Sequence, residues 1–377
     1  MKNILVAVTN DLIADQRVNK VCLTLLSLNA EVKLIGIQRK KSIPMNDRSY
    51  KTHRMKLFSK NGPLFYAEYN IRLFFYLLFN KCNLIVSNDL DTLPACYLAA
   101  KIKIIPIVYD SHEFFTDVPE LVGNKFAKNV WLFFEKKILP KLKYCYTVCE
   151  SIAKEYNRLY KTNMEVVRNV PLRMNPEFDS NFDHPALAEM DKTKKIILYQ
   201  GALNVGRGLE QTIQAMNYLN DCILVIIGEG DLSIQLRNQV VEQKMQTKVF
   251  FLGKLHFGEL KKITHKATLG LVLQEDCGLS YHYVLPNRIF DYIQSHVPVL
   301  VSELPELMKI MNDYKVGMTI PNLNPKIIAD TIQLLINSQN AYESYKNQCK
   351  LAANILNWEI ESKKLIKLYQ SIPGFLQ

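Results

Sequence analysis

Residues 194–219, KKIILYQGALNVGRGLEQTIQAMNYL, change their hydrophobic period halfway along. The run KKIILYQGA is typical of a buried strand, whereas GRGLEQTIQAMNYL repeats its apolar residues with helical spacing. Glycines lie between the two segments. A strand that turns through glycines into a helix is half of a βαβ unit, so this stretch predicts a parallel sheet covered by helices.

The same alternation of short apolar runs and longer helical patterns fills two blocks of the chain. Between them, PLRMNPEFDSNFDHPALAEMDKT has three prolines and several acids, which is typical of a linker. We therefore predict an α/β fold of two Rossmann-like, doubly wound domains that face each other across a cleft. The predicted domains are residues 1–170 and 194–355, with the linker at 171–193 and a C-terminal helix at 356–377 that packs back on the first domain.

The bulk composition favours a protein of the reducing cytosol. The 377 residues are 48% hydrophobic, but no apolar run approaches the roughly 18 residues that a membrane span needs. MKNILVAVTND lacks the apolar region and cleavage site of a signal peptide. The eight cysteines are scattered and show no zinc-binding spacing, so we expect free thiols. We predict a cytoplasmic protein.

The formal net charge of +11 predicts an anionic partner, which could be a nucleic acid, an anionic membrane or a phosphorylated substrate. The segment 125–143 combines Trp131, Phe133 and Phe134 with six lysines at roughly helical spacing. Such a basic amphipathic helix can lie on the inner face of the plasma membrane. Alternatively, its aromatic side chains face the core and its lysines face water.

Two glycine-rich loops follow predicted strands of the second domain. Free N–H groups at a helix start, glycines that permit close approach and a bidentate arginine would together suit a phosphate. Neither loop has a known phosphate-binding spacing, so ordinary turn glycines remain the alternative. The candidate residues are Gly201, Gly206, Arg207 and Gly208 in the first loop and Gly228 and Gly230 in the second.

The segment YHYVLPNRIFDYIQSHVPVLVSELPE (281–306) predicts a polar loop, a short helix and a buried strand. Pro286 suits the first helical position, which leaves Asn287 and Arg288 in the first turn to bind an oxyanion. Asp291 lies one turn later on the same face and could accept hydrogen bonds from a ribose. This arrangement predicts a site for a nucleotide diphosphate; the alternative is a surface pair between Arg288 and Asp291.

These segments resemble the retaining glycosyltransferases of family 4, the glycosyl transferases group 1, which have the GT-B fold. VLPNRIFDYIQSHVPVLVSELPE is similar to the family's carboxylate motif, and YQGALNVGRGLEQTIQAM, VIIGEGD and NWEIESKKLIKLY match other blocks in the right order. TNDLIADQRVNKVCLTLLSLNAEVKLIG resembles the N-terminal block and IVYDSHEFF the histidine segment. The resemblance covers nearly the whole chain and is weakest at 39–82 and 171–193.

The resemblance implies a nucleotide sugar held mainly by the C-terminal domain and transferred with retention, without an essential metal or other cofactor. Arg207 and Arg288 would bind the diphosphate, Asp291 the ribose, and His112 would lie near the transferring sugar. The sequence departs from the family at Tyr283, where a first glutamate is common, and at Ala202, where a basic residue is usual. Its first loop, NDLIADQR, also lacks the usual glycines.

Three further acids have alternative roles. Asp89 and Asp91 form a DxD pattern after a strand, which could hold a metal ion on a diphosphate, or Asp91 could cap the following helix. Asp15 could bind a ligand, although we favour a cap on the first helix. DSHEFF places His112 after a strand, where catalytic groups collect, although a lone histidine is more often structural.

Taken together, the sequence predicts transfer of a sugar from a nucleotide diphosphate sugar to an acceptor hydroxyl. The acceptor would be a glycan or a lipid-linked glycan bound by the first domain, in surface polysaccharide or glycolipid assembly. A nucleotide-sugar epimerase of the same fold and a non-catalytic nucleotide- or polyanion-binding protein are the alternatives. We do not expect nucleic-acid binding, because no recognition module accompanies the positive charge.

Overall fold

The chain forms two compact units in a computed structural model that describes residues 2–13, 15–40, 42, 44–45, 47–118, 121, 123–174, 187 and 190–375. The first unit comprises Met1–Asn169, Gly278–Ser280 and Ile360–Gln377. The second comprises Val170–Cys277 and Tyr281–Glu359.

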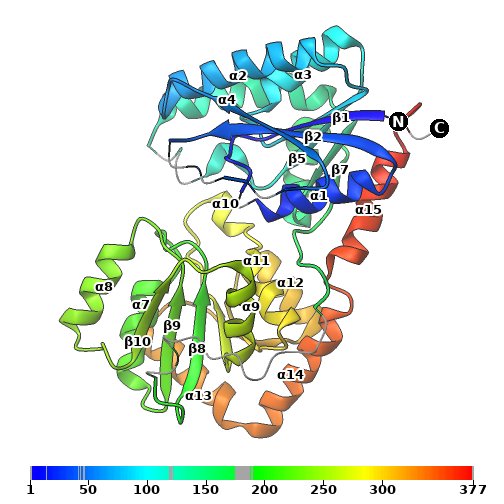
Figure 1. The fold of residues 1–377 in the computed structure, drawn as a ribbon. Helices are drawn as coiled ribbons and strands as arrows, with labels where there is room; N and C mark the ends of the chain where they lie inside the picture. The colour runs from blue at the N-terminus through cyan, green and yellow to red at the C-terminus, as the bar shows by residue number, and fades with distance from the viewer. Residues whose placement is uncertain are drawn as a thin grey trace. The chain divides into compact units, whose positions relative to one another are not determined.

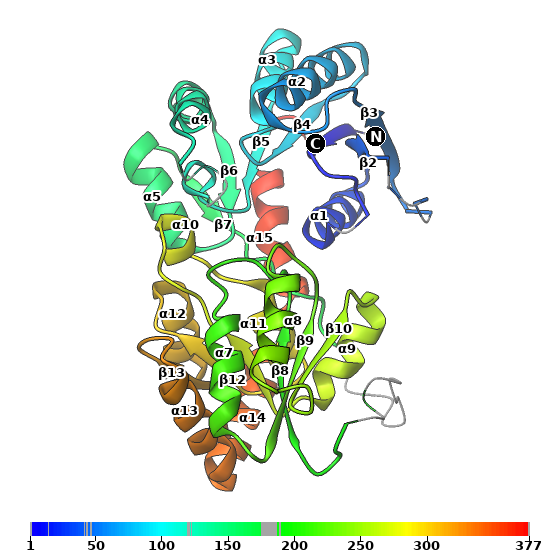
Figure 2. The ribbon, with the colours of Figure 1, turned by 90° about the vertical axis from the view of Figure 1, so that its left-hand side faces the viewer.

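In its described part, the first unit is a seven-stranded sheet with helices on both faces (Figure 1). The strands are β1 (Lys2–Ala7), β2 (Ala30–Gln38), β3 (Lys51–Lys56), β4 (Leu84–Asn88), β5 (Ile107–Ser111), β6 (Tyr144–Thr147) and β7 (Met164–Val166). The helices are α1 (Gln16–Leu26), α2 (Gly62–Phe79), α3 (Leu93–Lys103), α4 (Lys125–Ile138), α5 (Glu150–Tyr160) and most of α15 (Trp358–Gln370). Figure 2 shows α2 and α3 on one side of this sheet and α1 on the other.

The second unit repeats this plan with six described strands. They are β8 (Lys195–Gln200), β9 (Cys222–Ile227), β10 (Val249–Gly253), β11 (Leu269–Val272), β12 (Val299–Ser302) and β13 (Gly317–Ile320). Its helices are α7 (Leu209–Ala215), α8 (Ser233–Glu242), α9 (Phe257–Lys266), α11 (Asn287–Gln294), α12 (Pro305–Tyr314), α13 (Pro325–Asn337) and α14 (Gln339–Ala353). The short helix α10 (Leu279–His282) lies between β11 and α11 in the sequence.

Both sheets are parallel and doubly wound, which confirms the predicted α/β fold class. The strand orders are β3-β2-β1-β4-β5-β6-β7 and β10-β9-β8-β11-β12-β13. In each sheet the winding reverses beside the first strand, between β1 and β4 and between β8 and β11. Ligands of open α/β sheets bind beyond the carboxyl ends of the strands at such switch points, so these two edges are where functional groups are expected.

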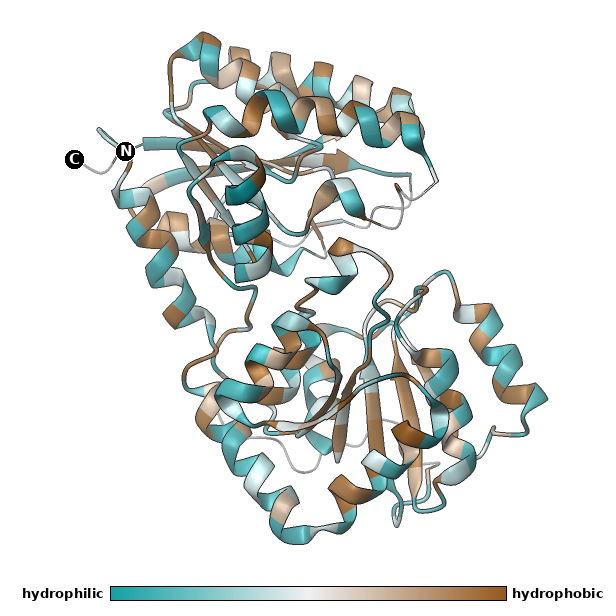
Figure 3. Cartoon of the chain, turned by 180° about the vertical axis from the view of Figure 1, so that it is seen from behind, coloured by the Kyte–Doolittle hydropathy of each residue, from teal (hydrophilic) through white to brown (hydrophobic). Residues whose placement is uncertain are grey.

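The apolar runs of the sequence become the central strands of each unit. In the second unit, the side chains of β8, β9, β11 and β12 form one buried core with α7, α8 and α13. In the first unit, β1, β2 and β4 form another core with α2 and α3. Figure 3 shows these strands as hydrophobic and the outer helix faces as mixed or hydrophilic. Strands buried on both faces are expected to be apolar, and β9 (CILVII) is apolar and buried throughout.

Several elements of the structure, among them β3, α2 and α12, were not predicted from the sequence, and one boundary differs. The sequence analysis predicted neither β3, whose residues KTHRMK are mostly polar, nor α2, whose apolar residues surround the helix. The segment from Tyr281, predicted to be a loop, begins inside α10. Residues 175–186, 188 and 189 of the predicted linker lie outside the described residues. No helix in the described part of the chain is both long enough and apolar enough to cross a membrane.

Candidate functional site

The loops that follow β8 and β11 meet at the switch point of the second sheet. The loop after β8 contains Gly201 to Gly208, and the loop after β11 begins at Leu273. The Glu275 N–H donates to the carbonyl of Gly206 at 3.0 Å, which joins the two loops. This junction positions the two arginines that the sequence analysis selected.

Arg207 and Arg288 converge on the side chain of Gln274. The Arg207 guanidinium donates through Nη1 to Gln274 Oε1 at 2.9 Å, and Arg288 donates through Nη2 to the same oxygen at 2.7 Å. Gln274 is the second residue after β11, and it is buried. The sequence analysis missed it because no motif marks it, although its place directly after a strand at a switch point is a usable signal.

Among the described residues, the Arg288 guanidinium contacts only neutral groups. Its side chain is 7% exposed, it donates to the Tyr199 hydroxyl at 3.3 Å, and it lies over the Tyr199 ring with 4.7 Å to the centroid. The surface pair with Asp291, kept as an alternative above, is therefore wrong. A buried cation without a counter-charge is costly, so this position is electrostatically prepared for an anion.

The glycines of the two loops are required for different reasons. Gly208 has φ +65° at the start of α7, and Gly201 has φ +136°, with its missing Cβ only 3.2 Å from Arg288 Nη1. A Cβ on Gly228 would lie 1.9 Å from the carbonyl oxygen of Gly201, and one on Gly230 would lie 2.6 Å from the N–H of Leu203. Gly228 and Gly230 thus pack the second loop against the first, which holds the first loop beside the arginines.

The first turn of α11 differs slightly from the prediction. Pro286 occupies the N-cap position, one residue before the predicted place, and Asn287 begins the helix with an exposed side chain. Asp291 accepts a hydrogen bond from Gln200 Nε2 at 3.1 Å. Burial lowers the pKa of Lys261, and the Asp291 carboxylate opposes that shift. Asp291 therefore lies at the end of β8, as Arg288 does.

His112 belongs to the first unit and follows β5 directly. Its Nδ1 lies 3.1 Å from Asp89 and its Nε2 lies 3.3 Å from Asp110. Burial lowers the pKa of His112, but the two carboxylates outweigh burial and raise this pKa well above its usual value. The two carboxylates accordingly favour the protonated form of the imidazole.

The carboxylate beneath His112 is part of a buried ion pair. Arg17 donates through Nη2 to Asp110 Oδ1 at 2.7 Å and through Nε to Oδ2 at 3.1 Å, with both side chains buried. Burial would raise the pKa of Asp110, but the charges of Arg17 and His112 lower it to about 2. The sequence analysis did not identify this pair, whose partners lie far apart in the chain.

The acids of the DxD pattern have other partners. Asp89 accepts from the His112 N–H at 2.8 Å, and Asp91 accepts from the Thr9 hydroxyl. Asp91 does not cap α3, because Thr92 occupies the N-cap position. The predicted cap by Asp15 is confirmed, since its carboxylate accepts from the N–H of Val18 at the start of α1.

The structure thus brings most predicted donor residues together in the second unit. Arg207, Arg288 and Gly201 lie around Gln274 and Tyr199, Asp291 lies at the end of the same strand, and Gly228 supports the loop. His112 is in the first unit, with its own carboxylates.

Comparison with known proteins agrees with this architecture. Residues 182–352 match the family model described as glycosyl transferases group 1. The chain is 23% identical over 199 residues to a phosphatidyl-myo-inositol mannosyltransferase of Mycobacterium leprae, which covers 52% of this chain and 51% of the relative. The chain thus spans about half the length of the curated relatives that it matches.

Two solved structures cover nearly the whole chain. The sucrose-phosphate synthase of Thermosynechococcus elongatus has a TM-score of 0.78 at 17% identity and covers 98% of both chains. HepE of Anabaena, in complex with UDP-glucose, has a TM-score of 0.71 at 13% identity and covers 98% of this chain and 100% of its own. The predicted GT-B fold is confirmed by these structures, and the match to the family model covers residues 182–352.

Proposed function

We propose that this chain transfers a sugar from a nucleotide diphosphate sugar to an acceptor hydroxyl. The observation that carries the proposal is the buried guanidinium of Arg288, which shares Gln274 Oε1 with Arg207 at the switch point of the second sheet. Two forked cations on a neutral acceptor are suited to a diphosphate, which binds arginine in a bidentate manner. The donor therefore occupies the second unit.

The chemistry follows from these charges. Breaking the bond between the sugar and the diphosphate leaves negative charge on the leaving group. Arg207 and Arg288 are already in place to stabilise that charge, so the active site needs little reorganisation. We infer a metal-independent reaction, because the two guanidiniums supply the positive charge that a metal ion would otherwise provide, and we infer retention of configuration from the family resemblance.

Two further residues complete the proposed donor site. Asp291, bonded to Gln200, has a carboxylate that can accept from the two hydroxyls of a ribose. Asn287 is exposed in the first turn of α11, where its amide can donate to a phosphate. From the family resemblance, we also propose that His112 lies near the transferring sugar, with both of its ring nitrogens facing carboxylates of the first unit.

The relatives support the substrate classes of this proposal. HepE binds UDP-glucose, and the mannosyltransferase acts, by its name, on a phosphatidyl-inositol lipid. We extend the donor class and a glycan or lipid-linked acceptor to this chain, in surface polysaccharide or glycolipid assembly. A cytoplasmic protein could meet such an acceptor at the membrane through α4, which exposes Phe126, Phe133 and Lys136.

A thermal-shift screen tests the donor site directly. Purified protein is melted with UDP, GDP, ADP and their sugars, with and without EDTA. A ligand of the folded state raises the melting temperature, so we expect a shift with one nucleotide that survives EDTA. Arg288→Met should abolish this shift. Arg237→Met, which removes a more exposed arginine of the same unit, should keep it.

A product assay separates transfer from the other activities of this fold. Sugar transfer releases the nucleotide diphosphate and glycosylates the acceptor. Epimerisation would convert the donor sugar without an acceptor, and a non-catalytic binder would leave the donor unchanged. A nucleotide shift in wild type that Arg288→Met retains would contradict the donor site proposed here.

A further inference from the structure

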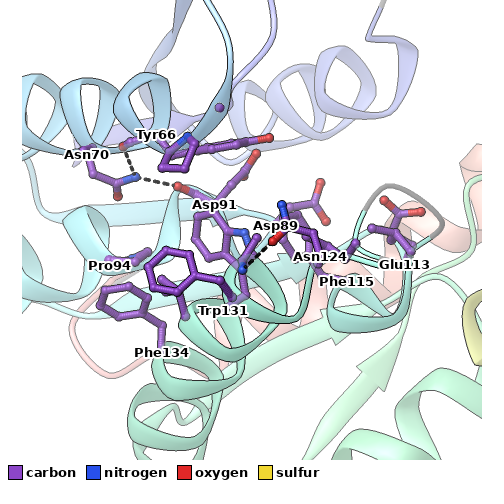
Figure 4. A pocket seen from close by; sticks show the side chains of 18 residues that line it. Tyr66, Asn70, Asp89, Asp91, Pro94, Glu113, Phe115, Asn124, Trp131 and Phe134 are labelled. Carbon is purple, nitrogen blue, oxygen red and sulfur yellow. Dashed lines mark hydrogen bonds between the residues drawn. The ribbon is translucent and has the colours of Figure 1, made fainter. Parts of the chain in front are cut away.

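The first unit contains a cavity of about 690 Å³ between α2 and α4. A cavity of this size matches the volume of typical small-molecule sites. Pro63, Tyr66 and Asn70 of α2 line one wall, and Ala127, Trp131 and Phe134 of α4 line the other. Figure 4 shows Trp131 and Phe134 beside each other and Asn70 close to Asp91. The cavity lies wholly within one unit, so its shape does not depend on the second.

The walls of this cavity are aromatic. Trp131 makes edge contacts with Tyr66 at 5.2 Å and with Phe115 at 5.5 Å between ring centroids, and it lies 6.3 Å from Phe134. Phe126, which is 72% exposed, also lines the cavity and lies toward the solvent. These residues offer an apolar surface that extends from the protein exterior inward, so the body of a bound molecule would be apolar.

One of the residues that line the cavity, Asp91, has an unsatisfied acceptor in its carboxyl group. Asp91 is 7% exposed, and its Oδ2 accepts from Thr9. Its Oδ1 is buried and has no hydrogen-bond partner among the described residues. Buried polar atoms of proteins are nearly always bonded, and an unpaired one needs an explanation. A ligand group that donates a hydrogen bond would supply the missing partner.

The charge of the lining defines the ligand's head group. Asp89, Asp91 and Glu113 contribute carboxyl groups, and no lysine, arginine or histidine occurs among the described lining residues. A phosphate or carboxylate would be repelled here. Asp89 is paired with His112 at 3.1 Å, and burial and the Asp89 charge raise the pKa of Asp91 to about 7, so the lining carries less negative charge than three free carboxylates and favours a neutral donor over a cation.

We propose that the cavity binds a molecule with an apolar body and a hydroxyl head group, with the hydroxyl on Asp91 and the body along Trp131 and Phe134. Such a molecule has the chemistry of an acceptor whose hydroxyl is glycosylated next to a lipid or other apolar group. The identification as acceptor rests on the proposed function, whereas the binding itself rests on the cavity alone.

Alkyl β-D-glucosides test the binding, because they share one hydroxyl head group and differ only in chain length. Methyl, hexyl, octyl and decyl glucoside are titrated below their micelle concentrations. The protein has two tryptophans, so Trp358→Phe leaves Trp131 as a single fluorescent reporter inside the cavity. Affinity should rise by up to about fourfold for each methylene that enters the cavity. Equal affinity for the methyl and octyl compounds would overturn the proposal.

A pair of variants on the same helix controls for fluorescence and folding effects. Ala127→Phe fills the cavity and should weaken octyl glucoside binding at least tenfold. Asn129→Phe adds the same ring at an exposed position of α4 that does not line the cavity, and it should keep the affinity within twofold. If Ala127→Phe melts like wild type and still binds octyl glucoside equally well, the cavity is not the site.

Two analogues test the head group. Octyl phosphate should bind at least tenfold more weakly than octyl glucoside, and octylammonium should not bind more tightly. The opposite result with either analogue would overturn the hydroxyl assignment. The nucleotide thermal shift depends on the second unit, so it separates the two proposals: a lost shift with glucoside binding retained would refute only the donor site.

Discussion

The carboxyl ends of the two sheets share one topology but carry their arginines in opposite electrostatic settings. In the first unit, Arg17 is paired with Asp110, which also contacts His112. In the second unit, Arg288 has only Gln274 and Tyr199 as described hydrogen-bond partners, and both are neutral. The first arrangement is complete without a ligand, whereas the second gains a counter-charge only when an anion binds.

This difference teaches what each arginine contributes. An arginine in a buried ion pair contributes to the stability of the fold, because removal of one partner leaves the other charge buried and uncompensated. A buried cation on neutral acceptors lowers the stability of the folded chain and favours anion binding. Four predictions challenge this comparison, beginning with the largest expected effect.

Arg17→Met should cost about 3–5 kcal/mol of unfolding free energy, because it leaves the Asp110 carboxylate buried without its bidentate partner. Urea unfolding followed by Trp131 fluorescence in the first unit measures this loss. Lys51→Met removes one side of the exposed pair with Glu31 and should cost about 1 kcal/mol or less. Equal losses in the two variants would contradict a structural role for the buried pair.

Gly228→Ala should cost at least about 2 kcal/mol, because φ is +133° and the new Cβ would collide with the carbonyl of Gly201. The nucleotide-induced thermal shift should also decrease, since the collision moves the loop next to Arg288. Gly258→Ala is the matched control in the same unit, because nothing lies within 4 Å of its missing Cβ. A Gly228→Ala protein as stable as this control would show that the loops separate freely.

Arg288→Lys should weaken nucleotide binding by about tenfold, since lysine keeps the charge but loses the planar fork. Titration calorimetry with the nucleotide found in the thermal screen gives the value. Arg288→Met should bind more weakly still, and its free energy of unfolding should not fall, because a cation without a counter-charge is removed. A large loss of stability in Arg288→Met would show that Arg288 stabilises the fold as Arg17 does, and would contradict the proposed difference between the two arginines.

The smallest predicted effect concerns pH. The folded-state pKa of His112 is raised, so its stabilisation is fully present below the unfolded value of about 6.5 and is lost as pH rises through the folded pKa. The stability difference between wild type and His112→Asn should therefore be largest near pH 6 and decrease at alkaline pH. Urea unfolding at several pH values measures this trend, and a difference that grows with pH would refute the charged imidazole.

Most of the fold could be predicted because buried parallel strands leave an apolar run wherever they occur. The stretch 194–219 predicted both β8 and α7, whereas the switch points come from the strand order of the folded sheets. The edge strand β3 could not be found in this way, since an edge needs few apolar residues and KTHRMK has one buried side chain. The helix α2 was not predicted, because its aromatic residues lie on the exposed side as well as on the core side and do not form one apolar face.

The arginines of the proposed donor site could be predicted from the sequence, but the residues that hold them in place could not. Arg207 and Arg288 stood out as arginines beside helix starts, but Gln274, which both contact, lies in no recognisable motif. The same holds in the first unit, where Asp15, Asp89 and Asp91 were candidates for binding a ligand or a metal ion, and Asp15 and Asp91 were also candidates for capping a helix. The roles of Asp89 and Asp91 depend on His112 and Thr9, which reach them only in the folded chain, whereas the Asp15 cap on Val18 is local and could be predicted.

The return of the chain to the first unit has a consequence for biosynthesis. Residues Ile360–Gln377 complete that unit, where Glu361 accepts from the N–H of Arg168 and the Tyr369 ring is buried. A ribosome must therefore translate the second unit before the first can close. At about 5–20 residues per second, the 190 residues from 170 to 359 correspond to about 10–40 seconds. During that interval the nascent first unit exposes apolar surface, which makes it a natural client of chaperones.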